Sequence, residues 1–412
     1  MMSRCGLVLF GLVVAGAGSG GAQSDAALAR ARRILKASPL VDGHNDLPIV
    51  IREDAKAPGD VAAYDLRRRT TGDTDLERLR LGQVGAQFWS VYIPGEIKDS
   101  GYAKVQLEQI DIARRVIERY PEALTLATSA ADVRAAFARG KIGSLLGMEG
   151  GHAIENSLGA LRAYYRLGVR YMTLTHNVTL DWADAAMDAP RHNGLTPFGK
   201  EVVREMNRLG MIVDISHVTP KVMHDVLDLA ESPVMFSHSS AKALTEHPRN
   251  VPDDVLRRLG KNGGVVMVTF IPAFVSQAVA DWEFKVRDLT KGNPSLSGVE
   301  RIKTEYAKTH PRPEATLKDV ADHIDHVRKT AGVDHVGIGS DYYGSPEMPQ
   351  GLKDVSRFPY LFAELIKRGW TDADLAKLAG GNILRVLREV EVTAARVQRQ
   401  RPPSTATFER MR

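Results

Sequence analysis

The chain has 412 residues, of which 43% are hydrophobic, and it carries a formal net charge of +5. This length allows one large α/β barrel or two ordinary domains, and the apolar content is enough for a large core. Most of the net charge comes from residues 391–412, which hold five arginines and two glutamates, so the rest of the chain is close to neutral. The charge therefore does not indicate a nucleic-acid groove, and we expect no nucleic-acid partner.

The first 22 residues have the pattern of a secretory signal peptide. Arg4 precedes an apolar run at 7–14, and small residues follow at 17–22. The apolar run is too short for a transmembrane helix. We expect removal of residues 1–22 and a periplasmic or secreted protein; the alternative is an uncleaved N-terminal anchor. The only cysteine, Cys5, lies in this segment, so the mature chain would have no disulfide, thiolate ligand or cysteine nucleophile.

Eight short apolar runs alternate with helical patterns along the rest of the chain. The predicted strands are 40–43, 84–91, 142–148, 169–175, 211–216, 233–237, 264–270 and 335–340. The predicted helices are 25–37, 102–120, 130–139, 157–167, 197–209, 220–229, 253–259, 317–330, 354–368 and 372–390. This alternation predicts one α/β domain over 23–390, a closed parallel (β/α)8 barrel of the TIM type. An open doubly wound sheet is the alternative, which is disfavoured because no glycine-rich phosphate loop follows the first strand.

Two segments fall outside the regular alternation. Residues 271–315 form a long connection between the seventh and eighth predicted strands, with helical patterns at 274–287 and 298–308. Connections of this length are uncommon unless they are functional, so we expect a lid or rim over the barrel mouth, or else a surface elaboration without a role in binding. We expect the Arg-rich tail 391–412, with its run Arg401-Pro402-Pro403-Ser404, to be disordered.

Acidic and histidine side chains gather at the C-terminal ends of the predicted strands. His44 and Asp46 follow the first strand, Glu149 the third, His176 the fourth, His217 the fifth, His238 the sixth and Asp341 the eighth. Active sites of barrel enzymes are built from these strand ends. A His-x-Asp pair alone is a weak signal, but its repetition around the barrel predicts a site for divalent metal ions.

Five of these side chains suit a site for two metal ions. His44, Asp46, Glu149, His217 and His238 supply only nitrogen and oxygen ligands, and Glu149 is the best candidate to bridge two ions. Two ions roughly 3.5–4 Å apart can share a hydroxide and polarise a carbonyl oxygen. Zinc is the expected metal, with Mn²⁺ or Co²⁺ as alternatives.

The two remaining strand-end residues suggest roles in catalysis. Asp341 could take a proton from the attacking water and pass it to a leaving amine. His176 could hold the oxyanion of a tetrahedral intermediate, or it could be a buried histidine without a role in catalysis.

The chain resembles the membrane (renal-type) dipeptidases, a zinc-dependent hydrolase family with bacterial members. The similarity lies in ordered blocks from the first predicted strand to the last. They are Val41-Asp42-Gly43-His44-Asn45-Asp46-Leu47-Pro48, Met148-Glu149-Gly150-Gly151, Leu174-Thr175-His176-Asn177, Trp182-Ala183-Asp184, Leu195-Thr196-Pro197-Phe198-Gly199, Asp214-Ile215-Ser216-His217, Phe236-Ser237-His238-Ser239-Ser240-Ala241, Arg249-Asn250-Val251-Pro252-Asp253-Asp254 and Gly337-Ile338-Gly339-Ser340-Asp341. The resemblance implies a distorted (β/α)8 barrel with a binuclear zinc site at the C-terminal strand ends.

The resemblance also implies a role for each site residue. His44 and Asp46 would bind one zinc, His217 and His238 the other, and Glu149 both. His176 would contact the substrate near the scissile carbonyl, and Asp341 would transfer the proton. Arg249 would bind the C-terminal carboxylate of a dipeptide, a role that suits the planar guanidinium fork.

The chain departs from the family pattern in three places. Its C-terminal segment is polar, so we expect no lipid anchor there. Without a mature cysteine, any homodimer would be non-covalent. The segment Phe270-Ile271-Pro272-Ala273 lacks a tyrosine that the resemblance leads us to expect, which leaves the substrate contacts of that loop open.

The leading hypothesis is a zinc dipeptidase that uses a metal-bridging hydroxide to cleave free dipeptides, including those with a C-terminal D-residue. The alternatives are an amidohydrolase-like barrel acting on N-acyl amino acids, lactones or β-lactams, and a binding protein that has kept the barrel but not the chemistry.

Overall fold

The structure is a computed structural model that describes residues 19–97, 101–293 and 295–411. Residues 1–18 of the predicted signal peptide lie outside the described residues. The first helix, α1 (Ser19–Ala37), begins within the last residues of that predicted segment. Within the described ranges, no helix is both long enough and apolar enough to cross a membrane.

A closed parallel sheet forms the centre of the molecule, which confirms the predicted TIM-type barrel. Its strands run in the order β2-β1-β9-β8-β7-β6-β5-β4-β3, and an additional pairing between β2 and β4 closes the ring. The strands are β1 (Leu40–Asn45), β2 (Val84–Ser90), β3 (Leu124–Leu126), β4 (Ile142–Glu149), β5 (Val169–Thr173), β6 (Ile212–Asp214), β7 (Met235–Ser239), β8 (Val265–Val268) and β9 (Val336–Ile338). All the pairings are parallel, so the C-terminal ends of the strands meet at one mouth of the barrel.

The sequence patterns predict eight of these nine strands and miss β3. This strand is only three residues long and pairs with the beginning of β4, where Leu124 is opposite Ile142. The fifth strand pairs with the end of β4, where Glu149 is opposite Thr173. The strands β3 and β5 therefore pair with different parts of β4, while β2 also pairs with β4 and closes the ring. The short strand β3 lies outside this ring of eight and does not open it.

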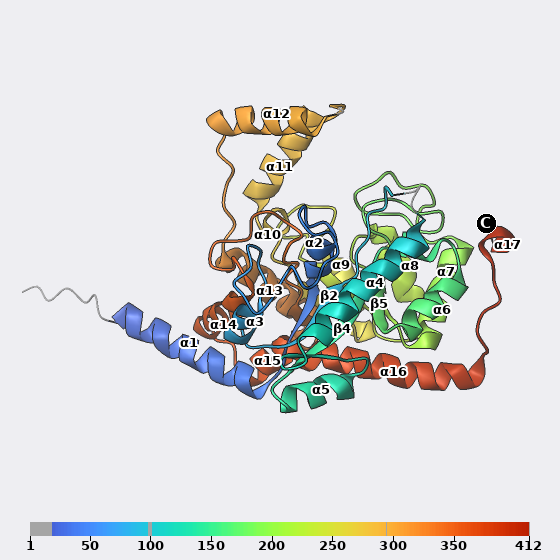
Figure 1. The fold of residues 1–412 in the computed structure, drawn as a ribbon, viewed down its shortest axis with the longest axis horizontal. Coiled ribbons are helices and arrows are strands. Elements are labelled where there is room, and N and C mark those ends of the chain that lie inside the picture. Colours follow the sequence, from blue (N-terminus) through green and yellow to red (C-terminus); the bar gives the residue numbers. More distant parts are fainter. Residues whose placement is uncertain (1–18, 98–100, 294, 412) are drawn as a thin grey trace, which may run out of the picture.

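Apolar side chains from the strands fill the barrel interior below the mouth. Val41, Phe88, Leu145, Tyr171 and Met267 are fully buried members of one cluster that also contains residues of α16 (Asn382–Gln400). Gly147 leaves room there, because a Cβ at this position would lie 2.1 Å from the Tyr171 ring. The long helix α16 lies along the bottom of the molecule in Figure 1, and its apolar residues close the barrel interior at that side.

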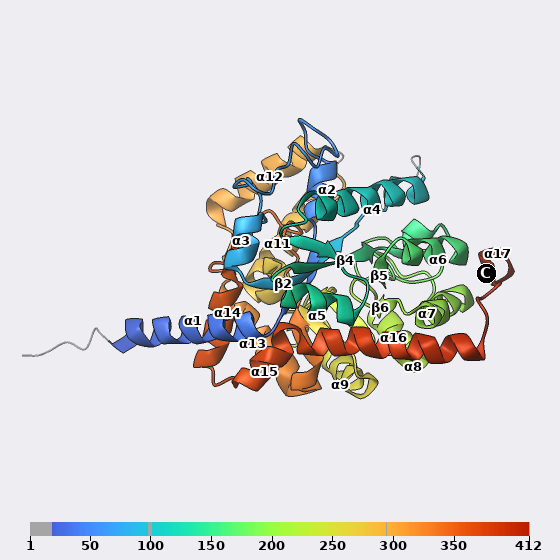
Figure 2. The same ribbon diagram turned by 60° about the horizontal axis from the view of Figure 1, so that its bottom comes forward.

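Helices surround the barrel, and all but the first two lie close to predicted positions; the sequence patterns did not predict those two. The helices are α2 (Leu47–Arg52), α3 (Leu76–Leu81), α4 (Tyr102–Arg119), α5 (Ala130–Ala138), α6 (Leu158–Arg166), α7 (Pro197–Leu209), α8 (Pro220–Leu229), α9 (Asp253–Asn262), α13 (Leu317–Ala331), α14 (Phe358–Lys367) and α15 (Asp372–Ala376). Hydroxyl side chains cap several of them: Thr196 accepts from the Gly199 N–H at the start of α7, and Thr219 accepts from the Val222 N–H at the start of α8. Figure 2 shows how the helices cover the sheet.

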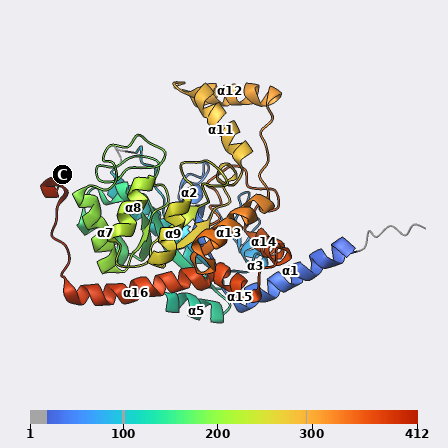
Figure 3. The ribbon, with the colours of Figure 1, turned by 180° about the vertical axis from the view of Figure 1, so that it is seen from behind.

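The long connection between β8 and β9 contains three helices, α10 (Pro272–Val275), α11 (Gln277–Thr290) and α12 (Leu296–Thr309). The two longer ones form a hairpin that projects from the side of the molecule opposite α16 (Figures 1 and 3). The Trp282 ring of α11 lies 6.0 Å from the Tyr306 ring of α12, and this contact holds the hairpin together. The predicted helices of the connection are therefore present.

The prediction of a disordered tail over 391–412 is wrong for the residues that the structure describes. Residues up to Gln400 belong to α16, and the following segment packs on α7, ending in α17 (Phe408–Met411). Arg401 donates to a carboxylate oxygen of Glu231 at 2.6 Å, and the Phe408 ring meets Phe198 edge-on. The composition concealed this order because the partners of the tail lie far away in the sequence.

Candidate metal centre and active site

The strand ends bring the predicted metal ligands together at the mouth of the barrel. His44 lies in β1, Asp46 follows that strand, Glu149 ends β4, His217 follows β6, and His238 lies in β7. All five residues are less than one tenth exposed. Three groups of three residues have ligand atoms within 4.8 Å of one another. They are His44, Glu149 and His238; Glu149, His176 and His217; and His44, Asp46 and Asp341.

Glu149 lies between two sets of ligands. Its Oε2 is 3.5 Å from Nε2 of His44, which in turn is 3.4 Å from Oδ1 of Asp46. Its Oε1 is 2.9 Å from Nε2 of His217 and 3.1 Å from Nε2 of His238. The two carboxylate oxygens therefore face different histidines, which is the arrangement required of a bridging ligand.

Hydrogen bonds orient the three histidines so that each presents Nε2 to the centre. Nδ1 of His44 lies 2.8 Å from the Tyr171 hydroxyl, Nδ1 of His217 lies 3.2 Å from the Asn177 amide oxygen, and Nδ1 of His238 lies 2.8 Å from the Ser237 hydroxyl. When Nδ1 donates its proton to these oxygens, Nε2 keeps a free lone pair. All three histidines are thus set to act as Nε2 ligands.

Asp214 and Asp42 are not part of the ligand cluster. They accept hydrogen bonds from residues next to the site residues. Asp214 accepts from the Ser237 hydroxyl at 2.5 Å and from the Ser237 N–H at 2.9 Å, and Ser237 in turn contacts His238. Asp42 accepts from the hydroxyl and N–H of Ser340, the residue before Asp341. Both carboxylates therefore fix the strand ends from which the ligands project.

The donor set fits divalent metal ions. Nε2 of His44 and Oδ1 of Asp46 are buried without a hydrogen-bond partner among the described residues, although unpaired buried polar atoms cost about 1–3 kcal/mol each. These atoms face each other and Glu149. Imidazole and carboxylate ligands without a thiolate are a set that zinc and similar ions accept.

The backbone turns sharply where two of the site residues follow short strands. His217 has φ 66° and Asp341 has φ 63°, both in the left-handed region that residues other than glycine rarely adopt. Such a conformation costs about 1–3 kcal/mol and persists where the surroundings hold it, often at functional sites. Here it directs both side chains toward the ligand cluster.

Asp341 lies at the edge of the cluster with its Oδ1 3.9 Å from Nε2 of His44. Burial, together with the nearby carboxylates of Asp46 and Glu149, raises the pKa of Asp341 to about 8. Without metal ions beside it, this carboxyl group is therefore largely protonated at neutral pH.

The ring of His176 lies between the ligand His217 and the ring of Tyr92. It is 4.5 Å from the His217 ring on one side and 4.7 Å from the Tyr92 ring on the other, measured between centroids. Burial lowers the pKa of His176, so its imidazole is neutral at neutral pH and retains one N–H donor.

Arg249 lies in the loop between β7 and α9 and is buried, with 2% exposure. Its guanidinium makes two contacts of 3.4 Å, to the Ser239 hydroxyl and to the His238 carbonyl, and its Nε has no partner. Among the described residues no carboxylate forms an ion pair with it. The Phe274 ring lies 5.2 Å from the guanidinium carbon. Burial lowers the pKa of Arg249 to about 10, so the side chain is still charged at neutral pH.

The sequence reasoning did not include Tyr92 and Phe274. Tyr92 follows β2, the one strand end of the first half of the barrel to which no site residue was assigned, so the strand-end rule could have identified it. Phe274 lies in the long connection after β8, and no local pattern links it to Arg249 in the loop after the neighbouring strand β7.

An eight-stranded parallel barrel with a buried histidine and carboxylate cluster at its C-terminal mouth defines a metal-dependent barrel hydrolase. The family model described as membrane dipeptidase (peptidase family M19) matches residues 28–401. The chain belongs to this family and is a metallo-dipeptidase.

Solved structures agree with this assignment. The probable dipeptidase PvdM from Pseudomonas aeruginosa is 26% identical with a TM-score of 0.79, over 90% of this chain and 100% of the other. An amidohydrolase from Pseudomonas aeruginosa is 25% identical with a TM-score of 0.67, over 87% and 98%. A metallo peptidase from Rhodobacter sphaeroides, liganded with a phosphinate mimic of the dipeptide L-Ala-D-Ala, is 26% identical with a TM-score of 0.70, over 86% and 99%.

Proposed function

We propose that the protein is a zinc dipeptidase that binds two metal ions per chain and hydrolyses free dipeptides, including those with a C-terminal D-residue. His44 and Asp46 would hold one ion, His217 and His238 the other, and Glu149 both. The observation that carries the proposal is the buried guanidinium of Arg249, which lies beside this cluster and has no carboxylate partner in the part of the chain that the structure describes.

The guanidinium of Arg249 binds the C-terminal carboxylate of the substrate. A planar guanidinium pairs with a carboxylate through two parallel hydrogen bonds, which fixes the position of the scissile bond. A longer peptide would place a neutral amide against this buried charge and lose the ion pair. The clamp therefore selects short substrates with a free carboxylate.

Two side chains handle charge and protons during the reaction. The zinc ions would activate a water molecule and polarise the carbonyl oxygen of the scissile bond. His176, which is neutral, donates a hydrogen bond to the oxygen that becomes negative. Asp341, whose Oδ1 lies 3.9 Å from Nε2 of His44, takes a proton from the attacking water as a carboxylate and delivers it to the leaving nitrogen.

A relative supports activity on a C-terminal D-residue. The Rhodobacter sphaeroides metallo peptidase, 26% identical over 86% of this chain, carries a phosphinate mimic of L-Ala-D-Ala. The proposal extends this substrate class to the present protein.

The proposal is tested with protein stripped of metal by a chelator and restored with zinc, manganese or cobalt. We expect cleavage of Leu-Ala and Ala-D-Ala only after restoration, best with zinc, and two metal ions per chain by elemental analysis. The N-acetylated forms of both dipeptides are assayed in parallel, and cleavage of these forms alone would instead indicate an acyl-amino-acid hydrolase. Absence of cleavage with two ions bound would contradict the substrate class.

We also propose that the protein is exported. The support is the pattern of Arg4, the apolar run 7–14 and the small residues 17–22 in the sequence. Mass spectrometry of the protein from cell fractions tests this: we expect a periplasmic or secreted form that begins near residue 23, and an intact N-terminus on a cytoplasmic form would contradict it.

A further inference from the structure

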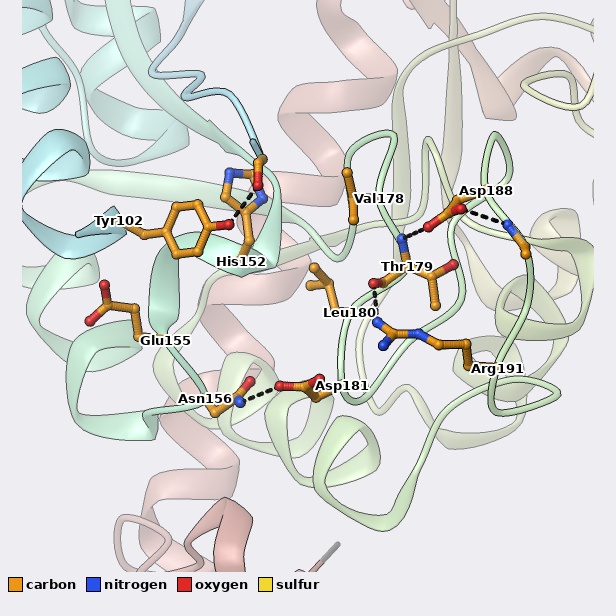
Figure 4. Close-up of a pocket in the computed structure, with 12 residues that line it drawn as sticks. Tyr102, His152, Glu155, Asn156, Val178, Thr179, Leu180, Asp181, Asp188 and Arg191 are labelled. Carbon is orange, nitrogen blue, oxygen red and sulfur yellow. Dashed lines mark hydrogen bonds between the residues drawn. The ribbon is translucent and has the colours of Figure 1, made fainter. Parts of the chain in front are cut away.

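A pocket of about 640 Å³ lies beside the candidate active site, between the turn after β4 and the loop after β5. Figure 4 shows Tyr102 and His152 on one side of this pocket, Val178 and Leu180 near its middle, and Asp181 and Asp188 from the loop after β5. No step of the proposed mechanism uses these residues.

The walls of the pocket continue directly from residues of the site. His152 follows Glu149 by three residues, and its ring lies against Gly150, where a Cβ would be 2.3 Å from the ring and 3.3 Å from Cβ of His176. Val178 comes two residues after His176, and Gly95 three residues after Tyr92, whose ring contacts His176. The pocket therefore adjoins the catalytic centre along the ends of β2, β4 and β5.

The order of strands places this pocket across the barrel from Arg249. The ring runs β1, β2, β4, β5, β6, β7, β8, β9, so β7 is opposite β2. Arg249 lies in the loop after β7 and its guanidinium contacts the His238 carbonyl of that strand. A dipeptide with its carboxylate at Arg249 and its scissile carbonyl over Glu149 extends its N-terminal residue away from β7. That direction leads to the ends of β2, β4 and β5, where the pocket lies.

Negative charge dominates the pocket lining. Glu155, Asp181 and Asp188 contribute three carboxylates against one cation, Arg191. The guanidinium of Arg191 donates to the Thr179 carbonyl, and Asp188 accepts from the Thr179 and Ala189 N–H groups. The charges of Arg191 and Asp188 thus already have partners in the loop.

The two other carboxylates retain more freedom to bind a ligand. Among the described residues, Asp181 accepts only from the Asn156 side-chain amide, at 2.9 Å through Oδ2, and Glu155 only from the Ala103 N–H, at 3.2 Å through Oε1. Within this part of the chain, the second oxygen of each carboxylate has no partner and can face a cation. Burial and the carboxylates of Glu96 and Glu155 raise the pKa of the Tyr102 phenol, which agrees with a negative potential here.

The remaining lining suits an aliphatic stem. Val178 and Leu180 are partly exposed in the pocket, and His152, with its ring 5.1 Å from the Tyr102 ring, forms the opposite wall. A lysine-like side chain places its methylene groups along such surfaces and its charge at polar groups beyond them.

We infer that this pocket receives the side chain of the N-terminal residue of the dipeptide and favours a cationic one, with Glu155 and Asp181 as the selective groups. The inference rests on the proposed function, because it takes the position of the substrate from the Arg249 clamp. Asp181 and Glu155 determine specificity and do not take part in bond cleavage.

The test compares kcat/KM of the zinc-loaded enzyme for Lys-Ala and for norleucyl-Ala, which has a similar length and no side-chain charge. Glu155 and Asp181 are exposed, and exposed ion pairs contribute modestly, so we expect a preference for Lys-Ala of about 2- to 10-fold at low salt. The double variant Glu155→Gln/Asp181→Asn, which retains the shape and the amide contacts, reduces this ratio to about 1. Ala-Lys and Ala-norleucine differ little in either protein, because the pocket receives the first residue and not the second.

A matched control removes two exposed carboxylates that do not line the pocket. Glu77→Gln/Asp372→Asn changes the net charge by the same amount, and we expect it to leave the preference for Lys-Ala unchanged. Equal rates for Lys-Ala and norleucyl-Ala in the unmodified enzyme, or a preference that survives in the Glu155→Gln/Asp181→Asn variant, would overturn the inference. If the zinc-loaded enzyme cleaves no dipeptide at all, the proposed function itself fails and this assignment fails with it.

Discussion

Two regions of the barrel mouth are built in different ways. One is the ligand cluster, and the other is the rim that faces the substrate, which contains Arg249 and Phe274. Each histidine of the cluster lies in a strand or directly after one, and its Nδ1 has an oxygen partner that sets the ring. Arg249, in contrast, is held by two contacts of 3.4 Å, with Nε unpaired. The cluster is preorganised by the barrel to receive cations, whereas the rim retains unsatisfied groups that a substrate can complete.

The largest effect is expected where the two regions meet, at Asp341. Asp341→Asn removes the proton acceptor but adds no bulk, so kcat for Leu-Ala should fall by about 10²- to 10⁴-fold. Because Asp341 is not one of the five proposed ligands, elemental analysis should still find both metal ions. Unchanged turnover would remove Asp341 from the mechanism, and loss of metal would move it into the ligand cluster.

Acid should lower the free energy of unfolding through His323, a buried histidine that is hydrogen-bonded to the loop that carries Arg249. Nδ1 of His323 accepts from the Ala241 N–H at 2.9 Å, and the residue is 1% exposed. Burial lowers its pKa from 6.5 to about 4. Between these values the unfolded chain binds a proton that the folded protein does not, so stability is complete above pH 6.5 and falls as the pH decreases toward 4.

The variant His323→Gln retains an oxygen that can accept from Ala241 and cannot be protonated. We expect it to reduce the acid-dependent loss of unfolding free energy by up to about 1.4 kcal/mol per pH unit in this window. Denaturant unfolding at several pH values measures the slope. The exposed His310→Gln is the control and should leave the slope unchanged, and equal slopes for His323→Gln and the unmodified protein would show that His323 is not responsible.

The supporting hydrogen bonds of the cluster can be tested at Ser237. Its hydroxyl connects the Asp214 carboxylate to Nδ1 of His238, so Ser237→Ala should weaken metal binding by about 10- to 100-fold. The hydroxyl of Ser240, three residues further along the chain, is buried without a partner, and Ser240→Ala should not change metal affinity. Competition with a chelator measures both variants. Equal affinities would mean that the barrel, and not this hydrogen bond, orients His238.

The same contrast explains what the sequence could predict. His44, Asp46, Glu149, His217 and His238 each follow a recognisable apolar strand, and the parallel barrel brings strand ends together regardless of their distance in the chain. Tyr171, which orients His44, and Phe274, which contacts Arg249, give no such signal, because their roles arise from contacts with residues of other strands and loops. The tail was misread for the same reason: the partners of Arg401 and Phe408 lie on α7 and just after α8, and no local pattern of the tail indicates them.

The smallest effect should come from Phe274, which belongs to the long connection. Its ring lies 5.2 Å from the guanidinium carbon of Arg249, and such cation–π contacts contribute about 0.5–2 kcal/mol. Because the ring orients the carboxylate clamp and lies away from the ligand cluster, Phe274→Leu should raise KM for Leu-Ala by about 2- to 10-fold and leave kcat and metal content unchanged. Phe274→Tyr keeps the aromatic face and should restore KM. A fall in kcat in Phe274→Leu would instead mean that the connection reaches the reacting atoms, and an unchanged KM would mean that Arg249 needs no support from it.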